Sequence, residues 1–355
     1  GTAACLAACL FAVLPCHSES VCWISGRTDL LAAVLGLGAT LMLMRGRTLA
    51  ALLLWLAGVL CKESAATLPA AWALIPASHP GTRRRGLAGR LALLALPAAY
   101  AGFRMLVSPG ILDGQSGGGM LVGPGWSPGE NLLRFVLRTF VPPLPSGLLP
   151  ALSGLPPALA VAAAVPVVAL VVILFVRRRP APELYRTVLA LLAGFLVLLL
   201  PVIGMKVALF DTQSERLLYL PGIPLLLASI LVIVSLAGEG RTARAVLLAA
   251  VAGGFVSTLH LSAGWARAGR LCDSLAADIL SQGDGGDVVI LNVPDNLNGA
   301  YVFRNGLNEA VRMAGGPGRC EILSTHSISS VEDPTTVDAD PGSARLEIPP
   351  GERFC

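Results

Sequence analysis

Residues 48–78 read TLAALLLWLAGVLCKESAATLPAAWALIPAS, and this stretch decides between two membrane topologies. Crossing the hydrocarbon core of a bilayer, about 30 Å, takes about 20 apolar residues in a helix. A single helix through the stretch would place Lys62 and Glu63 near the centre of the bilayer, where charged side chains are expensive. The stretch is therefore predicted to hold two short spans, 48–61 and 65–78, with the two charged residues in the turn between them.

The composition agrees with a membrane protein. Apolar residues make up 54% of the 355 residues, charged residues make up 14%, and the mean hydropathy is +0.72. Soluble domains carry about 25% charged residues, so these values exclude an ordinary cytosolic domain, a disordered chain and a nucleic-acid-binding protein. Lys62 and Lys206 are the only lysines. The Arg-, Ala- and Gly-rich usage suggests a GC-rich bacterial genome.

Nine apolar segments are predicted to cross the membrane and to form an all-α membrane domain over residues 1–263. Cytoplasmic loops are enriched in Lys and Arg, and the arginine clusters of four loops fall on one side when the nine segments alternate in direction. The turn at 62–63 and the chain after residue 264 then lie on the outer side. The segments are 1–15, 28–44, 48–61, 65–78, 91–107, 151–176, 187–205, 217–237 and 245–263.

Residues 264–355 are predicted to form a small α/β domain on the extracytoplasmic face. The run DVVILNV at 287–293 is typical of a buried strand. Further strands are predicted at 321–329 and 344–348. A helix is predicted at 298–314, because two glycines follow its last apolar residues.

The Gly- and Pro-rich outer loop contains one helical pattern. Residues 130–140, ENLLRFVLRTF, have helical apolar spacing with Arg134 and Arg138 on one side. The pattern predicts either an amphipathic helix at the outer membrane interface or a plain connecting helix.

In another outer loop, Cys16 and Cys22 are placed either to form a disulfide or to remain thiols. The cysteines and histidines form no zinc-type cluster; no cofactor is predicted with certainty, and a divalent metal ion remains open.

Ionisable residues of both signs gather near the predicted outer surface. Near a bilayer such groups indicate a functional site by default, although snorkelling and loop solvation explain each one singly. Cations there could hold the phosphate of a lipid carrier, and a carboxylate could accept a proton from an attacking hydroxyl. This fits sugar transfer from a polyprenyl phosphate, and the ion pathway of a transporter fits equally well. The set comprises His17, Glu19, Arg27, Asp29, Lys62, Glu63, Arg104, Lys206, Asp211, Glu215 and Arg216.

Three stretches resemble motifs of a known family. Residues 15–31, PCHSESVCWISGRTDLL, resemble the HPxHxExVxWIxGRxDLL signature of the transmembrane, tetratricopeptide-repeat O-mannosyltransferases and their bacterial relatives. Residues 61–63 (CKE) and 214–221 (SERLLYLP) are similar to two further motifs of that family, in the same order. The resemblance covers residues 1–280. It implies a GT-C glycosyltransferase, a multi-span enzyme that uses lipid-phosphate sugars on the lumenal or periplasmic face.

For this chain the resemblance implies an enzyme of the bacterial inner membrane. It would move a sugar, mannose being one option, from a polyprenyl-phosphate donor to a protein or glycan acceptor. His17 and Glu19 are expected to polarise the acceptor or to orient the catalytic acid. Arg216 is expected to bind the donor phosphate, with Glu215 orienting its guanidinium. The other lipid-phosphate ligands expected are Arg27, Lys62 and Arg104.

Structural roles are the alternative for several of these residues. Asp29 fits a helix N-cap, where its charge complements the helix dipole. Lys62 and Glu63 fit a local ion pair, and Tyr219 fits the aromatic belt of the membrane interface. Trp126, in the long outer loop, is a candidate to stack on a sugar.

The chain also departs from the family pattern. Leu14 stands at the position of the first motif histidine, Gly222 follows the third motif in place of serine, and no tetratricopeptide repeats follow. GT-C enzymes carry a catalytic carboxylate in the first outer loop, which is expected in a segment preceding residue 1; residues 1–355 alone are therefore expected to be inactive. The alternatives are a transporter or flippase of lipid-linked sugars, which would show an internal repeat with broken helices, or a non-catalytic membrane scaffold.

Overall fold

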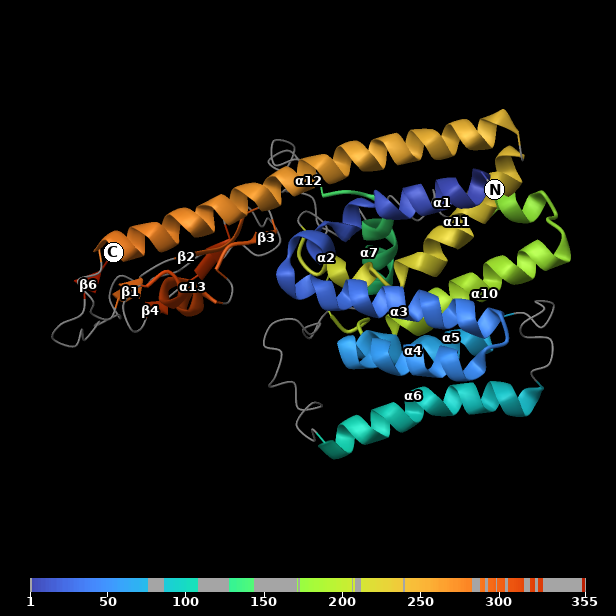
Figure 1. Cartoon of the computed structure of the whole chain (residues 1–355). Helices are drawn as coiled ribbons and strands as arrows, with labels where there is room; N and C mark the ends of the chain where they lie inside the picture. The colour runs from blue at the N-terminus through green and yellow to red at the C-terminus, as the bar shows by residue number, and fades with distance from the viewer. Residues whose placement is uncertain are drawn as a thin grey trace. The chain divides into compact units, whose positions relative to one another are not determined.

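The chain is mostly helical and divides into two compact units (Figure 1). The helical unit consists of Gly1–Pro142, Leu155–Leu209 and Ser214–Thr258, and the C-terminal unit of Pro143–Gly154, Phe210–Gln213 and Leu259–Cys355. The computed structural model describes residues 2–75, 86–107, 128–143, 171, 173–205, 207, 212–238, 240–282, 288–290, 293–297, 299–303, 306–315, 320–322, 325–327 and 353–354.

The helical unit begins with a broken helix. Helix α1 (Thr2–Ala12) is followed by the 3-10 turn η1 (Pro15–His17) and helix α2 (Ser18–Cys22), at a bend of 55°. Pro15 opens η1, since proline lacks an N–H and disrupts a continuing helix. The break leaves the carbonyl of Val13 without a helical donor, and the hydroxyl of Thr258 donates to it at 2.9 Å. The backbone carbonyl that the break exposes is therefore hydrogen-bonded to a side chain of α12 (Arg241–Gln282).

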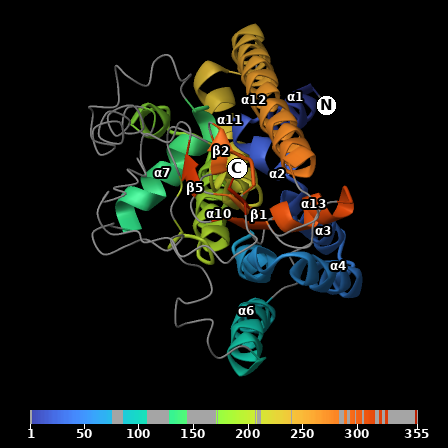
Figure 2. The same ribbon diagram turned by 90° about the vertical axis from the view of Figure 1, so that its left-hand side faces the viewer.

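Next comes a pair of antiparallel helices. After the turn η2 (Ile24–Gly26), α3 (Arg27–Met44) packs along α4 (Thr48–Cys61), as Figures 1 and 2 both show. Gly46 makes the reversal between them with φ of +74°, a conformation that glycine adopts without strain. The turn η3 (Glu63–Thr67) then leads into the short helix α5 (Leu68–Ala73). The indole of Trp55 donates to the carbonyl of Ala65 at 3.1 Å and so fixes η3 against α4.

The remaining elements close the unit around apolar cores. Among the described residues, one core joins α3, α4 and α5, a second joins α1 and α7 to α10 and α11, and a smaller one consists of Phe175, Val188 and Ala228. Helix α6 lies against α5 (Figure 1). The bounds are α6 Leu87–Val107, α7 Pro128–Phe140, α10 Pro182–Leu199, η6 Glu215–Leu218, α11 Gly222–Ala237 and α12 Arg241–Gln282.

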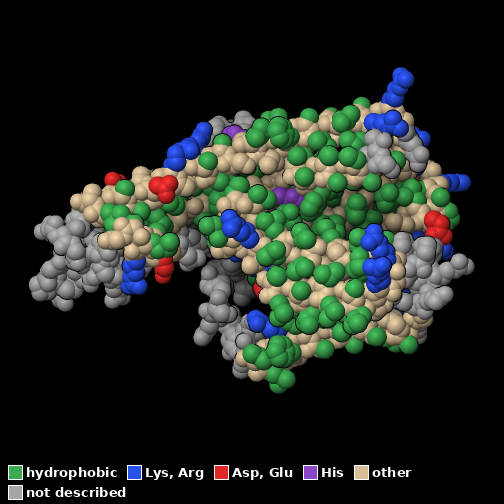
Figure 3. All heavy atoms as spheres, in the orientation of Figure 1, with side chains coloured by type: hydrophobic (Ala, Val, Ile, Leu, Met, Phe, Trp, Pro, Cys, Tyr) green, Lys and Arg blue, Asp and Glu red, His purple; other side chains and the backbone are tan. Residues whose placement is uncertain are grey.

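Apolar side chains also cover the outside of this unit. Leu60 and Leu106 are 81% and 85% exposed, and hydrophobic side chains spread over the helices in Figure 3. Exposed apolar surface of this extent marks an interaction surface such as a membrane. Four helices among the described residues have the length and composition of membrane spans, and the bent pair at the start would make a fifth. The four are Ile24–Met44, Ala88–Val107, Pro182–Leu199 and Arg241–Ser281.

The C-terminal unit contains short strands in two three-stranded sheets. One has the order β4-β1-β6, with β1 (Val288–Ile290) parallel to β4 (Cys320–Ile322) and to β6 (Arg353–Phe354). The other has the order β3-β2-β5, in which β2 (Val293–Leu297) pairs antiparallel with β3 (Ala300–Tyr301) and parallel with β5 (Thr325–Ser327). Helix α13 (Leu307–Met313) follows β3.

The structure changes several predicted segments. The ranges 28–44 and 48–61 match α3 and α4 closely, whereas 65–78 contains the turn η3 and six helical residues of α5. The segment 217–237 begins as a 3-10 turn and becomes α-helical at Gly222. Most of 151–176 and all of 344–348 lie outside the described residues.

The helix predicted at 298–314 is wrong in its first half. Strands β2 (Val293–Leu297) and β3 (Ala300–Tyr301) pair antiparallel there, and Gly299 lies between them with φ of +82°. The helix begins only at Leu307. In addition, the predicted domain boundary after residue 263 falls inside α12, and the two compact units divide between Thr258 and Leu259.

A close backbone contact at Gly26 yields a stability prediction. A Cβ atom on Gly26 would lie 2.7 Å from the Cα of Ser20, so we expect Gly26→Ala to lower the free energy of unfolding by about 1–3 kcal/mol. In Gly38→Ala, the matched control in α3, the added methyl meets the Leu54 side chain at an ordinary 3.5 Å. The control is expected to be neutral or stabilising by up to about 1 kcal/mol. Equal losses in denaturant unfolding of the two variants would contradict the contact.

Candidate functional site

Two turns far apart in the sequence exchange hydrogen bonds in the helical unit. The Ser18 hydroxyl donates to Oε2 of Glu215 at 3.0 Å, and the backbone N–H of Arg216 donates to Oε2 of Glu19 at 2.9 Å. We call residues 15–22 and 214–218 the paired turns. Each turn thus supplies one carboxylate and one donor, and each carboxylate accepts the hydrogen bond of the other turn. The first and third sequence motifs therefore meet at one place.

Both carboxylates of the paired turns are buried and face arginines. Glu215 forms an ion pair through Oε1 with Arg138 of α7, while Oε1 of Glu19 lies 3.8 Å from Nε of Arg216. Neither carboxylate has exposed surface. The sequence interpretation gave Glu215 the task of orienting Arg216; in the structure Glu19 holds that position and Glu215 faces Arg138 instead.

Arg216 has a second contact that fixes its guanidinium. Its Cζ atom lies 4.4 Å from the centre of the Trp23 ring, within the range of a cation–π interaction. The side chain remains 14% exposed. Arg216 is therefore held from two sides and still has accessible surface.

That surface lines a small pocket with charges of both signs, which we call the charged pocket. It has a volume of about 80 Å³. Nζ of Lys62 lies 3.9 Å from Oδ2 of Asp29, a long ion pair at the end of α4. The pocket brings together the second and third sequence motifs. Its lining residues are Asp29, Lys62, Glu63, Ser64, Pro201, Val202, Met205, Arg216, Leu217, Leu220 and Pro221.

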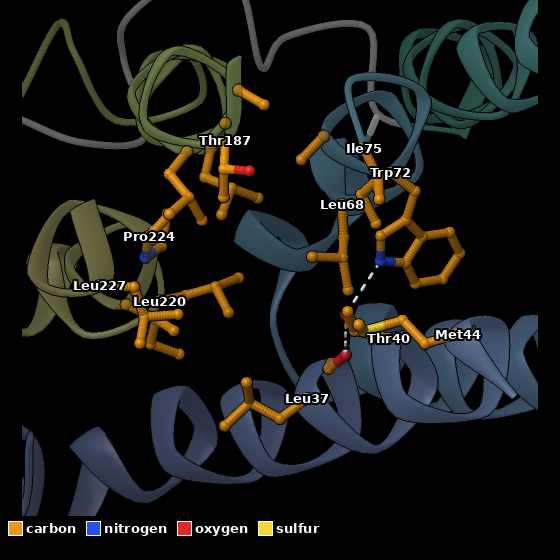
Figure 4. Close-up of a pocket in the computed structure, with 17 residues that line it drawn as sticks. Leu37, Thr40, Met44, Leu68, Trp72, Ile75, Thr187, Leu220, Pro224 and Leu227 are labelled. Carbon is orange, nitrogen blue, oxygen red and sulfur yellow. Dashed lines mark hydrogen bonds between the residues drawn. The ribbon is translucent and has the colours of Figure 1, made fainter. Parts of the chain in front are cut away.

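A larger, apolar pocket shares the lining residue Leu220 with the charged pocket. It has a volume of about 520 Å³ and lies between α3, α5, α10 and α11 (Figure 4). Its polar groups are satisfied within the wall: the Trp72 indole donates to the Thr40 hydroxyl at 2.9 Å, and that hydroxyl donates to the carbonyl of Gly36 at 2.8 Å. The wall therefore offers a bound molecule an apolar surface.

Helix α7 supplies an unexpected buried polar face. Arg134 and Arg138 are each 2% exposed, and the side chain of Asn131 donates to the carbonyls of Ile203 and Met205, the latter at 2.9 Å. Of the two predictions for this segment, an amphipathic helix at the outer interface and a plain connecting helix, the burial of both arginines contradicts the first. The sequence signal was the spacing of Asn131, Arg134 and Arg138 on one helix face, which fits burial against a polar partner as well as exposure to lipid headgroups.

His17 lies beside the paired turns without lining the charged pocket. Its ring is 4.5 Å from the ring of Phe11 and 4.3 Å from that of Tyr219, measured between centroids. Its Nε2 has no hydrogen-bond partner among the residues that the structure describes. These contacts give His17 a packing role in the structure.

Other predicted residues lie apart from the charged pocket. Arg27 is exposed at the start of α3, and Arg104 is half-buried in α6; neither is among the residues that line the pocket. Lys206, Asp211 and Trp126 are outside the described residues. No disulfide joins Cys16 to Cys22.

Glu19→Ala tests the contact between the paired turns. It leaves the Arg216 amide without its acceptor and the guanidinium without its carboxylate, so we expect the free energy of unfolding to fall by about 2–4 kcal/mol, somewhat below the usual cost of breaking a buried ion pair. Glu19→Gln keeps an acceptor and should cost less. The matched control is Glu183→Ala, which removes an exposed ion pair with Arg186 and should leave stability nearly unchanged. Similar losses for Glu19→Ala and Glu183→Ala would contradict the assignment.

Comparison with known proteins adds no relative. No protein-family model, curated protein or solved structure matches this chain. Within the described part of the chain, no group of three or more His, Cys, Asp or Glu side chains is placed to hold a metal ion. The functional argument therefore rests on the paired turns and on the two pockets that share Leu220.

Proposed function

We propose that the chain is a membrane glycosyltransferase of the GT-C type, similar to the transmembrane O-mannosyltransferases. It binds a sugar carried on polyprenyl phosphate and transfers that sugar to a protein or glycan acceptor. The observation that carries the proposal is that Leu220 lines two pockets of different character. One is small and has Lys62 and Arg216 in its wall, and the other is large and apolar.

The charged pocket suits the phosphate of such a donor. Arginine binds phosphate oxygens with a fork of N–H donors, and lysine acts as a compact point charge. The ion pairs that now hold Arg216 and Lys62 are long, at 3.8 and 3.9 Å. At these distances neither cation forms a direct hydrogen bond to its carboxylate, so both have N–H donors left for a phosphate oxygen.

The apolar pocket suits the isoprenoid chain. Its wall includes Gly36 and Met44 of α3, eight residues apart, a separation of about 12 Å along a helix. The pocket thus continues from Leu220 deep between the helices. A phosphate in the charged pocket would leave its hydrocarbon tail next to this space, where burial of apolar surface is favourable.

The transfer step needs a base and a stabilised leaving group. The acceptor oxygen forms a bond to the anomeric carbon, the bond from that carbon to the phosphate oxygen breaks, and the phosphate leaves with the bonding electrons. Lys62 and Arg216 would compensate the charge that develops on the phosphate. Asp29 and Glu63 are the carboxylates in the wall of the charged pocket, so they are placed to take the acceptor proton.

We also propose the full topology that the sequence predicts. Nine spans in a bacterial inner membrane put the charged pocket on the outer side, because α3 starts near Asp29 and ends at Arg45 and Arg47, residues typical of a cytoplasmic loop. The C-terminal unit would then be an extracytoplasmic α/β domain.

The phosphate site is tested by binding of farnesyl phosphate to the full chain in lipid nanodiscs. Arg216→Gln and Lys62→Gln are each expected to weaken affinity by about tenfold or more, since a charged hydrogen bond is worth about 1.5–3 kcal/mol. Arg27→Gln, at an exposed arginine outside the pocket, is the matched control and should bind like the unchanged protein. Unchanged affinity in both pocket variants would refute the site.

The tail site is tested by filling the apolar pocket. Ala190 of α10 lines it, so Ala190→Phe should weaken farnesyl phosphate binding. Isopentenyl phosphate carries a single isoprene unit and serves as the matched probe. Its affinity is expected to change little, because the charged pocket is untouched. If Ala190→Phe affects neither probe or both equally, the apolar pocket does not hold the chain.

A further inference from the structure

The buried ion pair behind the charged pocket has no part in the binding step described above. Arg138 of α7 and Glu215 of η6 form it, with side chains 1% and 0% exposed, and neither is among the residues that line the pocket. A guanidinium stays charged in a protein. A buried ion pair is often no more stabilising than apolar residues of similar volume, so fold stability alone gives little reason for this one.

The pair determines how four neighbouring charged side chains are matched. They are Glu19, Arg138, Glu215 and Arg216. Glu215 directly precedes Arg216, and neighbouring Cα atoms are about 3.8 Å apart. Both oxygens of Glu215 are engaged, one by Arg138 and the other by the Ser18 hydroxyl. Arg216 meets Glu19 instead, with its side chain at 3.8 Å. Arg138 and Glu215 are in direct contact and do not line the pocket. Arg216 and Glu19 are farther apart, and Arg216 lines the pocket.

We propose that Arg138 is a positioning residue for the anionic group of the donor. By holding Glu215, it leaves the guanidinium of Arg216 available to a phosphate in the charged pocket. The identity of that anion rests on the proposed function. Without Arg138, Glu215 would be a buried carboxylate with no cation of its own, beside Arg216. It would compete for the Arg216 guanidinium and repel an incoming phosphate, since charges in a partly buried site are weakly screened.

Helix α7 is anchored independently of Glu215. Asn131 donates to the carbonyls of Ile203 and Met205, and Phe135 has no exposed surface. Replacing Arg138 with methionine, which keeps an unbranched side chain, removes the charge and the hydrogen bond that Arg138 Nη1 donates to the Val141 carbonyl at 2.5 Å. The contacts of Asn131 and Phe135 remain and keep the helix attached. This separation makes it possible to distinguish a charge effect from a general loss of structure.

The test measures farnesyl phosphate affinity of the full chain in nanodiscs for Arg138→Met, Glu215→Gln and the double variant. Arg138→Met should weaken binding by about tenfold, because one negative charge becomes unpaired near the pocket. Glu215→Gln unmasks a positive charge and should leave binding equal or tighter. The double variant restores the charge balance and should bind within about threefold of the unchanged protein. A purely structural pair would weaken binding in all three.

Two results would overturn the proposal. One is a double variant that binds about as weakly as Arg138→Met, and the other is a tenfold loss in Glu215→Gln. The affinity of Glu215→Gln can be measured even if Arg138→Met fails to fold. Arg134→Met is the matched control, a buried arginine one turn earlier in the same helix. Adding Glu215→Gln should not restore any affinity that Arg134→Met loses.

Melting temperatures separate this proposal from the proposed function. If the unchanged protein binds no farnesyl phosphate, the proposed function fails. The coupling between Arg138 and Glu215 can then still be measured from the Tm values of the variants. Arg138→Met should lower Tm, and adding Glu215→Gln should recover part of the loss, whereas adding Glu19→Gln should give an additive loss. An additive loss of Tm for Arg138→Met with Glu215→Gln would show that the two residues are not coupled. It would overturn the proposal that Arg138 holds Glu215 away from Arg216.

Discussion

Two carboxylates without exposed surface, Glu19 and Glu215, determine how the helical unit comes together. A buried carboxylate needs a cation and hydrogen-bond donors in contact with it, because removing it from water costs several kcal/mol. Arg138 of α7 and Arg216 of η6 supply the cations, and Ser18 and the backbone of Arg216 supply the donors. This requirement joins α2, α7 and the turn before α11, which are far apart in the sequence.

The same joint places the groups of the proposed site. Once Glu19 and Trp23 hold Arg216, its remaining surface borders the charged pocket. Lys62 reaches that pocket from the end of α4, where Asp29 of the neighbouring helix faces it. Leu220 follows the turn η6 and forms part of both pockets. A small charged pocket that shares a residue with a large apolar one fits the donor proposed above, an anionic lipid with a single long chain.

The sequence predicted much of the helical unit and less of the site. Apolar runs bounded by arginines predicted α3 and α4 nearly to the residue, because Gly46 and the charged Lys62 and Glu63 end them locally. The short α5 and the pairing of β2 with β3 depend on contacts with distant segments or on one glycine conformation, which apolar spacing does not record. Local patterns are weakest where tertiary contacts decide the outcome.

At the site, motif spacing singled out Glu19, Lys62, Glu215 and Arg216, but it could not say which carboxylate meets which arginine. Adjacent residues of a 3-10 turn point in different directions, so Glu215 turns away from Arg216 and toward α7. The sequence left Arg138 either on an interfacial helix or on a plain connecting helix, and it did not indicate burial, since an arginine on an amphipathic helix is exposed far more often than buried.

The central claim is that the charged and apolar pockets hold one polyprenyl phosphate. A crystal structure of the full chain grown in lipid with farnesyl phosphate tests it most directly. The account predicts the phosphate at hydrogen-bond distance from Nζ of Lys62 and from the guanidinium of Arg216, with the chain passing Leu220 into the space between α3 and α10. Farnesyl phosphate bound elsewhere, with Lys62 and Arg216 still facing Asp29 and Glu19 and the apolar pocket empty of its chain, would contradict it.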